Sequence, residues 1–279
     1  MLQPGSRRRA RLSAWRAFAV WVCFACALPA AADEFSAFAG VWPYHLRGGI
    51  VDRGANTNIV LDSNNGVQVN PQVQVLLHYG FTRYHQSCWI PELYAGYVHL
   101  GAAGQVPATE TATFGGVPII KGNTQIFPNI NLNDYELAAD WCWPMIHSTQ
   151  VRVESGLKLK YLAGHGNVRT DTTVSLLGVV PVQHLVSETP FSVDQPVPLV
   201  ELRGRADPWP WLRLEANGGY IFYAGNHAGE LRAAADLFLL DHLALTAAYQ
   251  EQIYKVKANP YLLHARLSGP SLGITITTP

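Results

Sequence analysis

The sequence predicts an all-β fold, an antiparallel transmembrane β-barrel of about ten strands, with eight as the alternative, preceded by a cleaved signal peptide. Three observations predict it: an apolar composition with few charges, segments in which charged and apolar residues alternate, and connections that are alternately long and short. An exported apolar chain without membrane helices has one main competing architecture, a soluble β-sandwich with a large core.

The first 32 residues have the pattern of a secretory signal peptide. Arg7, Arg8 and Arg9 make a basic start, residues 17–28 carry no charge, and residues 30–32 are three alanines. An apolar run of this length makes a helix of about 18 Å, too short for a hydrocarbon core of about 30 Å. We therefore expect residues 1–32 to be removed and residues 33–279 to form a single barrel domain.

The composition excludes some classes of function. Charged residues make up 14% and apolar residues 48% of the chain, whereas soluble proteins average about 25% charged. Removal of the signal peptide leaves 15 basic against 20 acidic residues. This mildly acidic chain has no basic field for a phosphate backbone, so we expect no nucleic-acid partner.

The alternation of charged and apolar residues is clearest in residues 150–161, 195–206, 211–223 and 230–239. In each segment one face of a strand would be charged and the other apolar. The charged faces carry both signs in near balance, which suits a barrel lumen of paired charges and an exterior in lipid. The predicted lumen-facing network consists of Asp134, Glu136, Asp140, Arg152, Glu154, Lys158, Lys160, Glu201, Arg203, Arg205, Arg213, Glu215, Glu230, Arg232 and Asp236.

The predicted connections alternate in length. Those at 47–67, 101–128 and 162–194 are long, and those at 144–149, 207–210 and 240–242 are short, as expected for outer loops and periplasmic turns. Tryptophans flank the short turns, where an interface girdle would lie. A change in the spacing of apolar residues at Gly269 and Pro270 predicts a β-bulge there. The ten predicted strands are 37–46, 68–81, 92–100, 129–143, 150–161, 195–206, 211–223, 230–239, 243–254 and 263–276.

The mature chain has no H-x-x-x-H, H-E-x-x-H or paired C-x-x-C pattern, so we expect no metal site, no cofactor and no catalytic residue. Cys88 and Cys142 can pair in an oxidising compartment or remain separate thiols. An outer-rim hydrolase acting on lipid or peptide is the less favoured alternative. It would draw on residues in or near predicted outer loops: His165, His184 and His227, beside Asp171, Ser187 and Glu188.

Four segments in order carry a family resemblance: INLNDYELAADWCWP, VESGLKLKYLAG, PVPLVELRGRADPWPWLRLEANGGYIFY and LSGPSLGIT. Their order resembles a family of poorly characterised proteobacterial outer-membrane β-barrel proteins, and residues 39–42 resemble its first strand. The resemblance covers most of the chain after Tyr84 and implies fold and location. It supplies no catalytic residue.

Together these observations predict an integral outer-membrane barrel, either structural or a narrow pore. A small barrel with many long charged side chains is largely plugged by them. The expected partners are outer-membrane lipid and lipopolysaccharide, together with the barrel-assembly machinery, and small solutes are possible.

Overall fold

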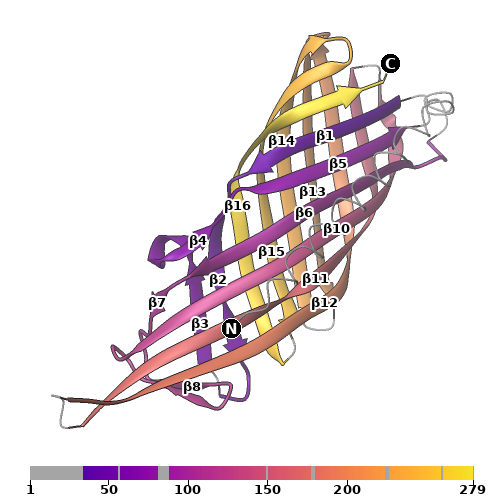
Figure 1. Cartoon of the computed structure of the whole chain (residues 1–279). Helices are drawn as coiled ribbons and strands as arrows, with labels where there is room; N and C mark the ends of the chain where they lie inside the picture. Colours follow the sequence, from indigo (N-terminus) through magenta and orange to yellow (C-terminus); the bar gives the residue numbers. More distant parts are fainter. Residues whose placement is uncertain are drawn as a thin grey trace, which may run out of the picture.

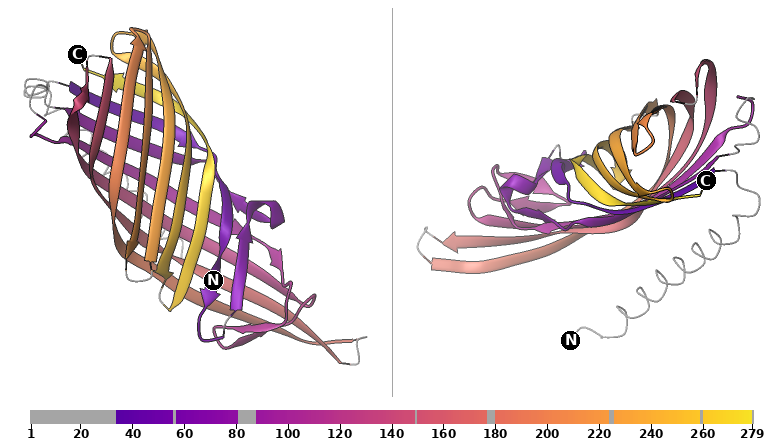
Figure 2. Two further views of the ribbon diagram at one scale, coloured as in Figure 1. Left: turned by 180° about the vertical axis from the view of Figure 1, so that it is seen from behind. Right: turned by 90° about the horizontal axis from the view of Figure 1, so that it is seen from above.

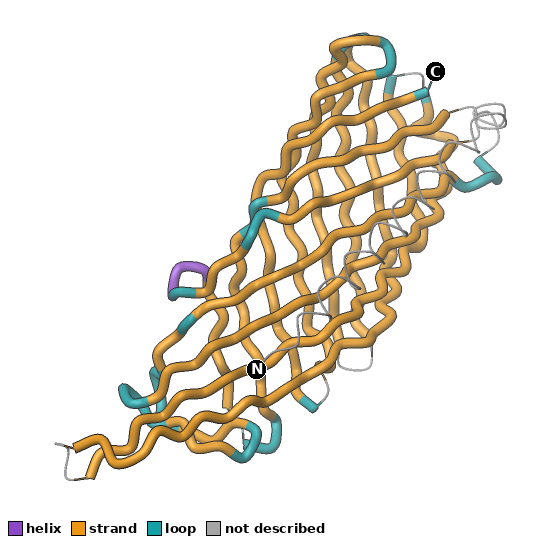
Figure 3. Tube along the Cα trace, in the orientation of Figure 1, coloured by secondary structure: helices purple, strands orange, loops and turns teal. Residues whose placement is uncertain are grey.

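The computed structural model of the chain describes residues 34–55, 57–80, 88–148, 150–176, 180–223, 226–258 and 260–278. The predicted signal peptide, residues 1–32, lies outside them. Nearly all described residues belong to β-strands (Figure 3). No helix among them is long and apolar enough to cross a membrane.

Antiparallel strands close on themselves into a tilted barrel (Figure 1). Within the described residues the last strand, β16, pairs with the first, β1, so that Ala37 lies opposite Ile276. The strands of the ring correspond to the ten predicted ranges. They are β1 (Glu34–Trp42), β5 (Gln72–Gly80), β6 (Glu92–Gly104), β10 (Thr124–His147), β11 (Val151–Leu176), β12 (Val180–Trp209), β13 (Leu212–Tyr223), β14 (Asn226–Leu240), β15 (Leu243–Ala258) and β16 (Tyr261–Thr277).

Short elements extend one end of the barrel. Strand β2 continues along β16 after β1 is interrupted at Pro43, and β4 and β5 both pair with β6 on either side of Pro71. Proline has no N–H to donate, so both strands break where it occurs. The added elements are β2 (His45–Asp52), β3 (Thr57–Asp62), η1 (Ser63–Asn65), β4 (Val67–Val69), β7 (Val106–Pro107), β8 (Ala112–Phe114) and β9 (Val117–Ile119).

The two ends of the barrel differ in their connections. One end of the barrel contains both the start of β1 and the end of β16, where the Phe35 N–H donates to Thr278 Oγ1 at 3.0 Å. At this same end residues 210–211 and 241–242 are short turns. Outer-membrane barrels have short turns on the periplasmic side, so we call this the periplasmic end. At the opposite, outer end β11 and β12 project beyond the other strands (Figures 1 and 2).

The long strands are far longer than a membrane requires. Strand β11 has 26 residues and β12 has 30, whereas about 9 to 11 tilted residues cross a bilayer. The chain therefore has a membrane zone toward the periplasmic end and an outer zone beyond it.

Side-chain polarity inverts between these zones. On β11 the inward-facing residue changes from Lys160 to Leu162, and on β12 from Glu201 to Leu199. The outward face changes in the opposite sense, because Tyr161 is followed by Ala163 and the exposed His165. The membrane zone is thus apolar outside and charged inside, whereas the outer zone has an apolar core and a polar surface, as in a soluble protein.

This inversion corrects two expectations. The segments predicted as long outer loops are mostly strands, since β2, β3, β7, β8, β9 and the outer parts of β11 and β12 occupy them. The predicted bulge at Gly269 and Pro270 is also wrong: pairing with β15 runs without a shift through both residues. Apolar residues change face there because Leu267 points into the outer core and Leu272 points outward in the membrane zone.

Candidate functional site: the barrel lumen

Two lysines on β11 form the centre of the charged lumen. Lys158 Nζ lies 3.1 Å from Glu201 Oε2 and 3.6 Å from Glu136 Oε2, and it also bonds Glu230. Lys160 Nζ lies 3.0 Å from Asp134 Oδ2 and 2.7 Å from Glu230 Oε2. Each buried ammonium is shared among several carboxylates, because a single partner would not repay its desolvation.

Toward the periplasmic end, Arg203 continues the network. Its Nε lies 3.0 Å from Asp140 Oδ2 and its Nη2 lies 2.8 Å from Glu201 Oε1. The guanidinium also stacks on Tyr94, with Cζ 3.7 Å from the ring centroid. Asn217 donates to the same Glu201 oxygen at 3.0 Å. Polar side chains on β10, β12 and β13 are thereby held in one hydrogen-bonded layer.

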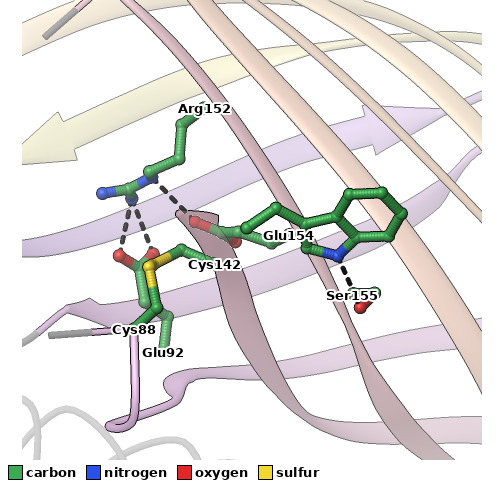
Figure 4. Close-up of a disulfide and its surroundings, with 7 residues drawn as sticks. Cys88, Glu92, Cys142, Arg152, Glu154 and Ser155 are labelled. Atoms are coloured by element: carbon green, nitrogen blue, oxygen red, sulfur yellow. Dashed lines mark hydrogen bonds and ion pairs between the residues drawn. A yellow bond between two sulfur atoms is a disulfide. The ribbon is translucent and has the colours of Figure 1, made fainter. Parts of the chain in front are cut away.

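A second cluster lies where β6 and β11 approach the periplasmic end (Figure 4). Arg152 Nη2 lies 2.7 Å from Glu92 Oε1, and Arg152 Nε lies 2.7 Å from Glu154 Oε1. Glu92 also contacts His78 Nε2 at 2.7 Å. Cys88 and Cys142 form a disulfide beside this cluster. The bond joins the segment before β6 to β10, and it fits an oxidising compartment.

A third cluster surrounds the periplasmic mouth of the lumen. Arg205 lies 2.7 Å from Glu34 and 3.0 Å from Asp207, and Arg213 lies 3.0 Å from Asp207 and 3.8 Å from Glu34. Each carboxylate therefore bridges two guanidinium groups. Trp209 and Trp211 flank the same mouth, stacked with ring centroids 5.2 Å apart.

The remaining predicted residues border a cavity of about 80 Å³ in the middle of the lumen. Arg232 Nη1 lies 3.9 Å from Glu215 Oε2, a looser pair than the others. Asp236 accepts from Thr246 Oγ1 at 2.7 Å. Gln252 also lines the cavity, which has room for a few water molecules.

Apolar side chains fill the lumen above this cavity. Trp42 is fully buried, and its indole Nε1 donates to the Gly269 carbonyl at 3.2 Å. Its ring lies 5.0 Å from that of Tyr44, whose hydroxyl donates to the Gly101 carbonyl. We call the buried apolar cluster beyond this pair the outer core. It includes Leu46, Ile50, Leu132, Leu162, Val168, Phe191, Val193, Leu199, Val256, Leu263 and Leu267.

The structure brings all fifteen predicted residues to the lumen but also adds partners that the sequence did not suggest. Glu34 and Glu92 lie at the starts of strands, and Asp207 lies in a segment predicted as a turn. Tyr94 and Tyr254 add hydroxyl groups to the lumen from β6 and β15, two strands on which no lumen residue was predicted. Glu92 already begins the predicted strand 92–100, Asp207 directly follows the predicted strand 195–206, and Glu34 lies three residues before the predicted strand 37–46. Extending each strand by up to three residues could therefore have found all three acids.

Of the histidines proposed for a rim hydrolase, His165 and His227 lie on different strands, β11 and β14, and the side chain of His184 lies outside the described residues. His165 is exposed on the outer surface of β11, and His227 stacks near Tyr220 and Phe222. Across the described side chains, neither histidine has a hydrogen bond to a serine or carboxylate. Nor do the described residues contain a group of three histidine, cysteine or acidic side chains that could hold a metal ion.

The exterior of the membrane zone is an apolar belt between two aromatic rows. Tyr135 and Trp143 bound it on β10, eight residues apart. At about 3.3 Å per residue and a tilt of about 40°, the belt is about 20 Å tall, close to that of membrane barrels. Exposed apolar residues of the belt include Leu137, Leu157, Leu159, Val200, Leu202, Leu214, Leu231, Leu237, Leu245, Leu272, Ile274 and Ile276.

Comparison with solved structures supports this architecture. The chain is similar to the outer membrane protease OmpT from Escherichia coli, with a TM-score of 0.54 and 7% sequence identity over 88% of this chain and 97% of that one. The chain is less similar to the translocator domain of autotransporter NalP from Neisseria meningitidis. The TM-score is 0.37 and the sequence identity 12%, over 96% of this chain and 95% of that one. Protein-family models gave no match, and neither did curated proteins.

The closed ring, the apolar belt and the charged lumen define an integral membrane β-barrel. Its fold is that of outer-membrane β-barrels, as the similarity to OmpT shows.

Proposed function

We propose that the protein is a sealed structural barrel that anchors its own outer zone at the cell surface. The single observation that carries this proposal is the outer core, which occupies the lumen where any solute would have to pass. Leu199 within the outer core and Trp42 directly below it are at most 1% exposed.

A pore needs a continuous polar path, because ions and polar solutes lose hydration in an apolar constriction. Among the described side chains, the lumen is charged only in the membrane zone. Its cavity is bordered above by Gln252 and then by Val256 and other apolar residues of the outer core. The charged layer links the strands of the ring to one another, and the outer core closes the lumen.

The proposal includes two partners. Membrane lipid surrounds the apolar belt, and the barrel-assembly machinery would close the ring between β1 and β16. The outward-facing residues where these two strands pair are apolar or small, as insertion into lipid requires: Phe35, Ala37, Ala39 and Val41 on β1, and Leu272, Ile274 and Ile276 on β16.

Conductance in planar bilayers tests the proposal. The wild-type protein is expected to give no channel steps above the bare bilayer. The variant Trp42→Ser/Leu199→Ser, which makes the constriction wettable, is expected to conduct, whereas Leu157→Ser on the exterior of β11 is the matched control and is expected to remain silent. Steady channels from the wild-type protein would show that the barrel is a pore.

A further inference from the structure

A face rich in amide and imidazole side chains lies on the exterior of the outer zone. We call it the amide face and define it by six residues on three neighbouring strands: His99 on β6, Asn129, Asn131 and Asn133 on β10, and His165 and Asn167 on β11. All six point away from the outer core, and Asn129, Asn131 and His165 are exposed.

The strand register aligns these side chains in rows. Asn133 lies opposite His99, Asn131 lies opposite His165, and Asn129 lies opposite Asn167. Strands lie about 4.8 Å apart and successive rows about 6 to 7 Å apart, so the face measures about 10 by 13 Å. Such an area suits two or three sugar rings.

Small residues on both flanking strands, β6 and β11, make the face shallow. Gly101 lies beside Asn131, Ala103 lies beside Asn129, and Ala163 lies beside Asn133. A planar ligand can therefore approach the amide groups without a clash from neighbouring side chains.

One amide is held in place by its neighbours. Asn133 Oδ1 accepts from Tyr97 Oη at 3.0 Å and lies 3.1 Å from His99 Nδ1. A side chain that is already ordered loses less conformational entropy when it binds a ligand.

The charge of the face indicates the chemistry of the ligand. Each asparagine offers both donors and an acceptor, the combination that hydroxyl groups require. The cation nearest to these rows, among the described exterior side chains of β10 and β11, is Arg169, one row beyond Asn167. A phosphate-binding surface would need several cations, so the face suits a neutral polyhydroxylated ligand.

The height of the face indicates where that ligand comes from. Its lowest row, with Asn133, directly follows Tyr97, Tyr135 and Tyr161, the aromatic row that borders the apolar belt. The face therefore continues the lipid interface outward, at the level of the lipid headgroups.

We propose that the amide face binds the neutral sugars of the lipopolysaccharide that surrounds the barrel in the outer leaflet. This inference rests on the membrane placement in the proposed function and adds a partner to it. The amide face would then hold the sealed barrel in the sugar layer by hydrogen bonds, in addition to the contact of the apolar belt with lipid.

Thermal unfolding in defined vesicles tests the inference. The full chain is folded into phosphatidylcholine vesicles that contain either lipopolysaccharide with a complete core oligosaccharide or lipid A alone. By mass action the complete core should raise the wild-type midpoint by roughly 5 °C relative to lipid A. The variant Asn129→Ala/Asn131→Ala/His165→Ala should keep its midpoint in lipid A and lose the increment.

The matched control is His264→Ala, an exposed histidine of the outer zone on β16, which should retain the full increment. Equal midpoints in the two vesicles, or equal loss in both variants, would overturn the inference. So would a midpoint that depends on protein density rather than on the lipid, which would assign the face to a second copy of the chain. Failure of the wild-type protein to insert into either vesicle would instead contradict the membrane placement.

Discussion

A single arginine at Leu157 tests the assignment of faces in the membrane zone. Leu157 is 63% exposed on the exterior of β11 and lies between Ala139 and Val200 on the neighbouring strands. It is six residues from Val151 and four from Tyr161, and therefore near the middle of the apolar belt. An arginine at the bilayer midplane costs about 2 to 4 kcal/mol in membrane barrels.

A cost of about 3 kcal/mol corresponds to a change of about a hundredfold in the folding equilibrium. With a urea dependence of about 2 to 3 kcal/mol per molar, the midpoint of unfolding in vesicles should fall by about 1 M or more. Leu157→Met, which keeps the side chain apolar, should change it little.

The same charge placed on the lumen side provides the second control. Gln252 lines the cavity and lies opposite Glu230, so an arginine there has both room and a carboxylate. We expect Gln252→Arg to lower stability by much less than Leu157→Arg. Equal damage from the two variants, or greater damage from Gln252→Arg, would refute the assignment of faces.

Three further predictions follow from the lumen and the outer zone. Lys160→Met leaves buried carboxylates unpaired and should cost about 3 to 5 kcal/mol in urea unfolding, part of which Glu230→Met should restore in the double variant. Cys142→Ser opens a disulfide between residues 54 apart and should cost about 2 to 4 kcal/mol, as reduction of the wild-type protein should. The Gly115 N–H donates to the Asp52 carboxylate at 2.8 Å and lowers its pKa. Because a depressed pKa gives stability that is lost as pH falls through it, the protection of the Gly115 amide against exchange, relative to its intrinsic rate at each pH, should fall below about pH 4 and should already be low in Asp52→Asn.

Much of the membrane zone could be predicted from the sequence because the two solvents there are so different. Lipid outside and paired charges inside impose a strict alternation, as in Val153, Glu154, Leu157 and Lys158. The ring strands were found wherever this contrast was present. Their approximate limits, and the faces of all fifteen predicted charged residues, followed from it.

The outer zone escaped prediction for the complementary reason. Water surrounds it, and its exterior positions hold asparagine, histidine and small residues rather than leucine. Segments such as residues 162–176 have weak contrast between their faces, including two glycines on the inward face, Gly164 and Gly166. They read as loops although they pair strand to strand. The pairing of Cys88 with Cys142 was also beyond the sequence, since it depends on the position of the chain before β6.

The misread bulge on β16 shows how a barrel that leaves the membrane can be recognised. A true bulge adds one residue and turns every later side chain to the other face. On β16 the backbone keeps its register with β15, and only the chemistry of each face changes, from Leu263 and Leu267 inside to Leu272 and Ile276 outside. The same exchange occurs on β11 and β12, which a local bulge on β16 cannot explain. A switch of apolar parity shared by several long strands therefore marks the plane where lipid ends, and the strands that continue beyond it form a second, water-exposed core on the same ring.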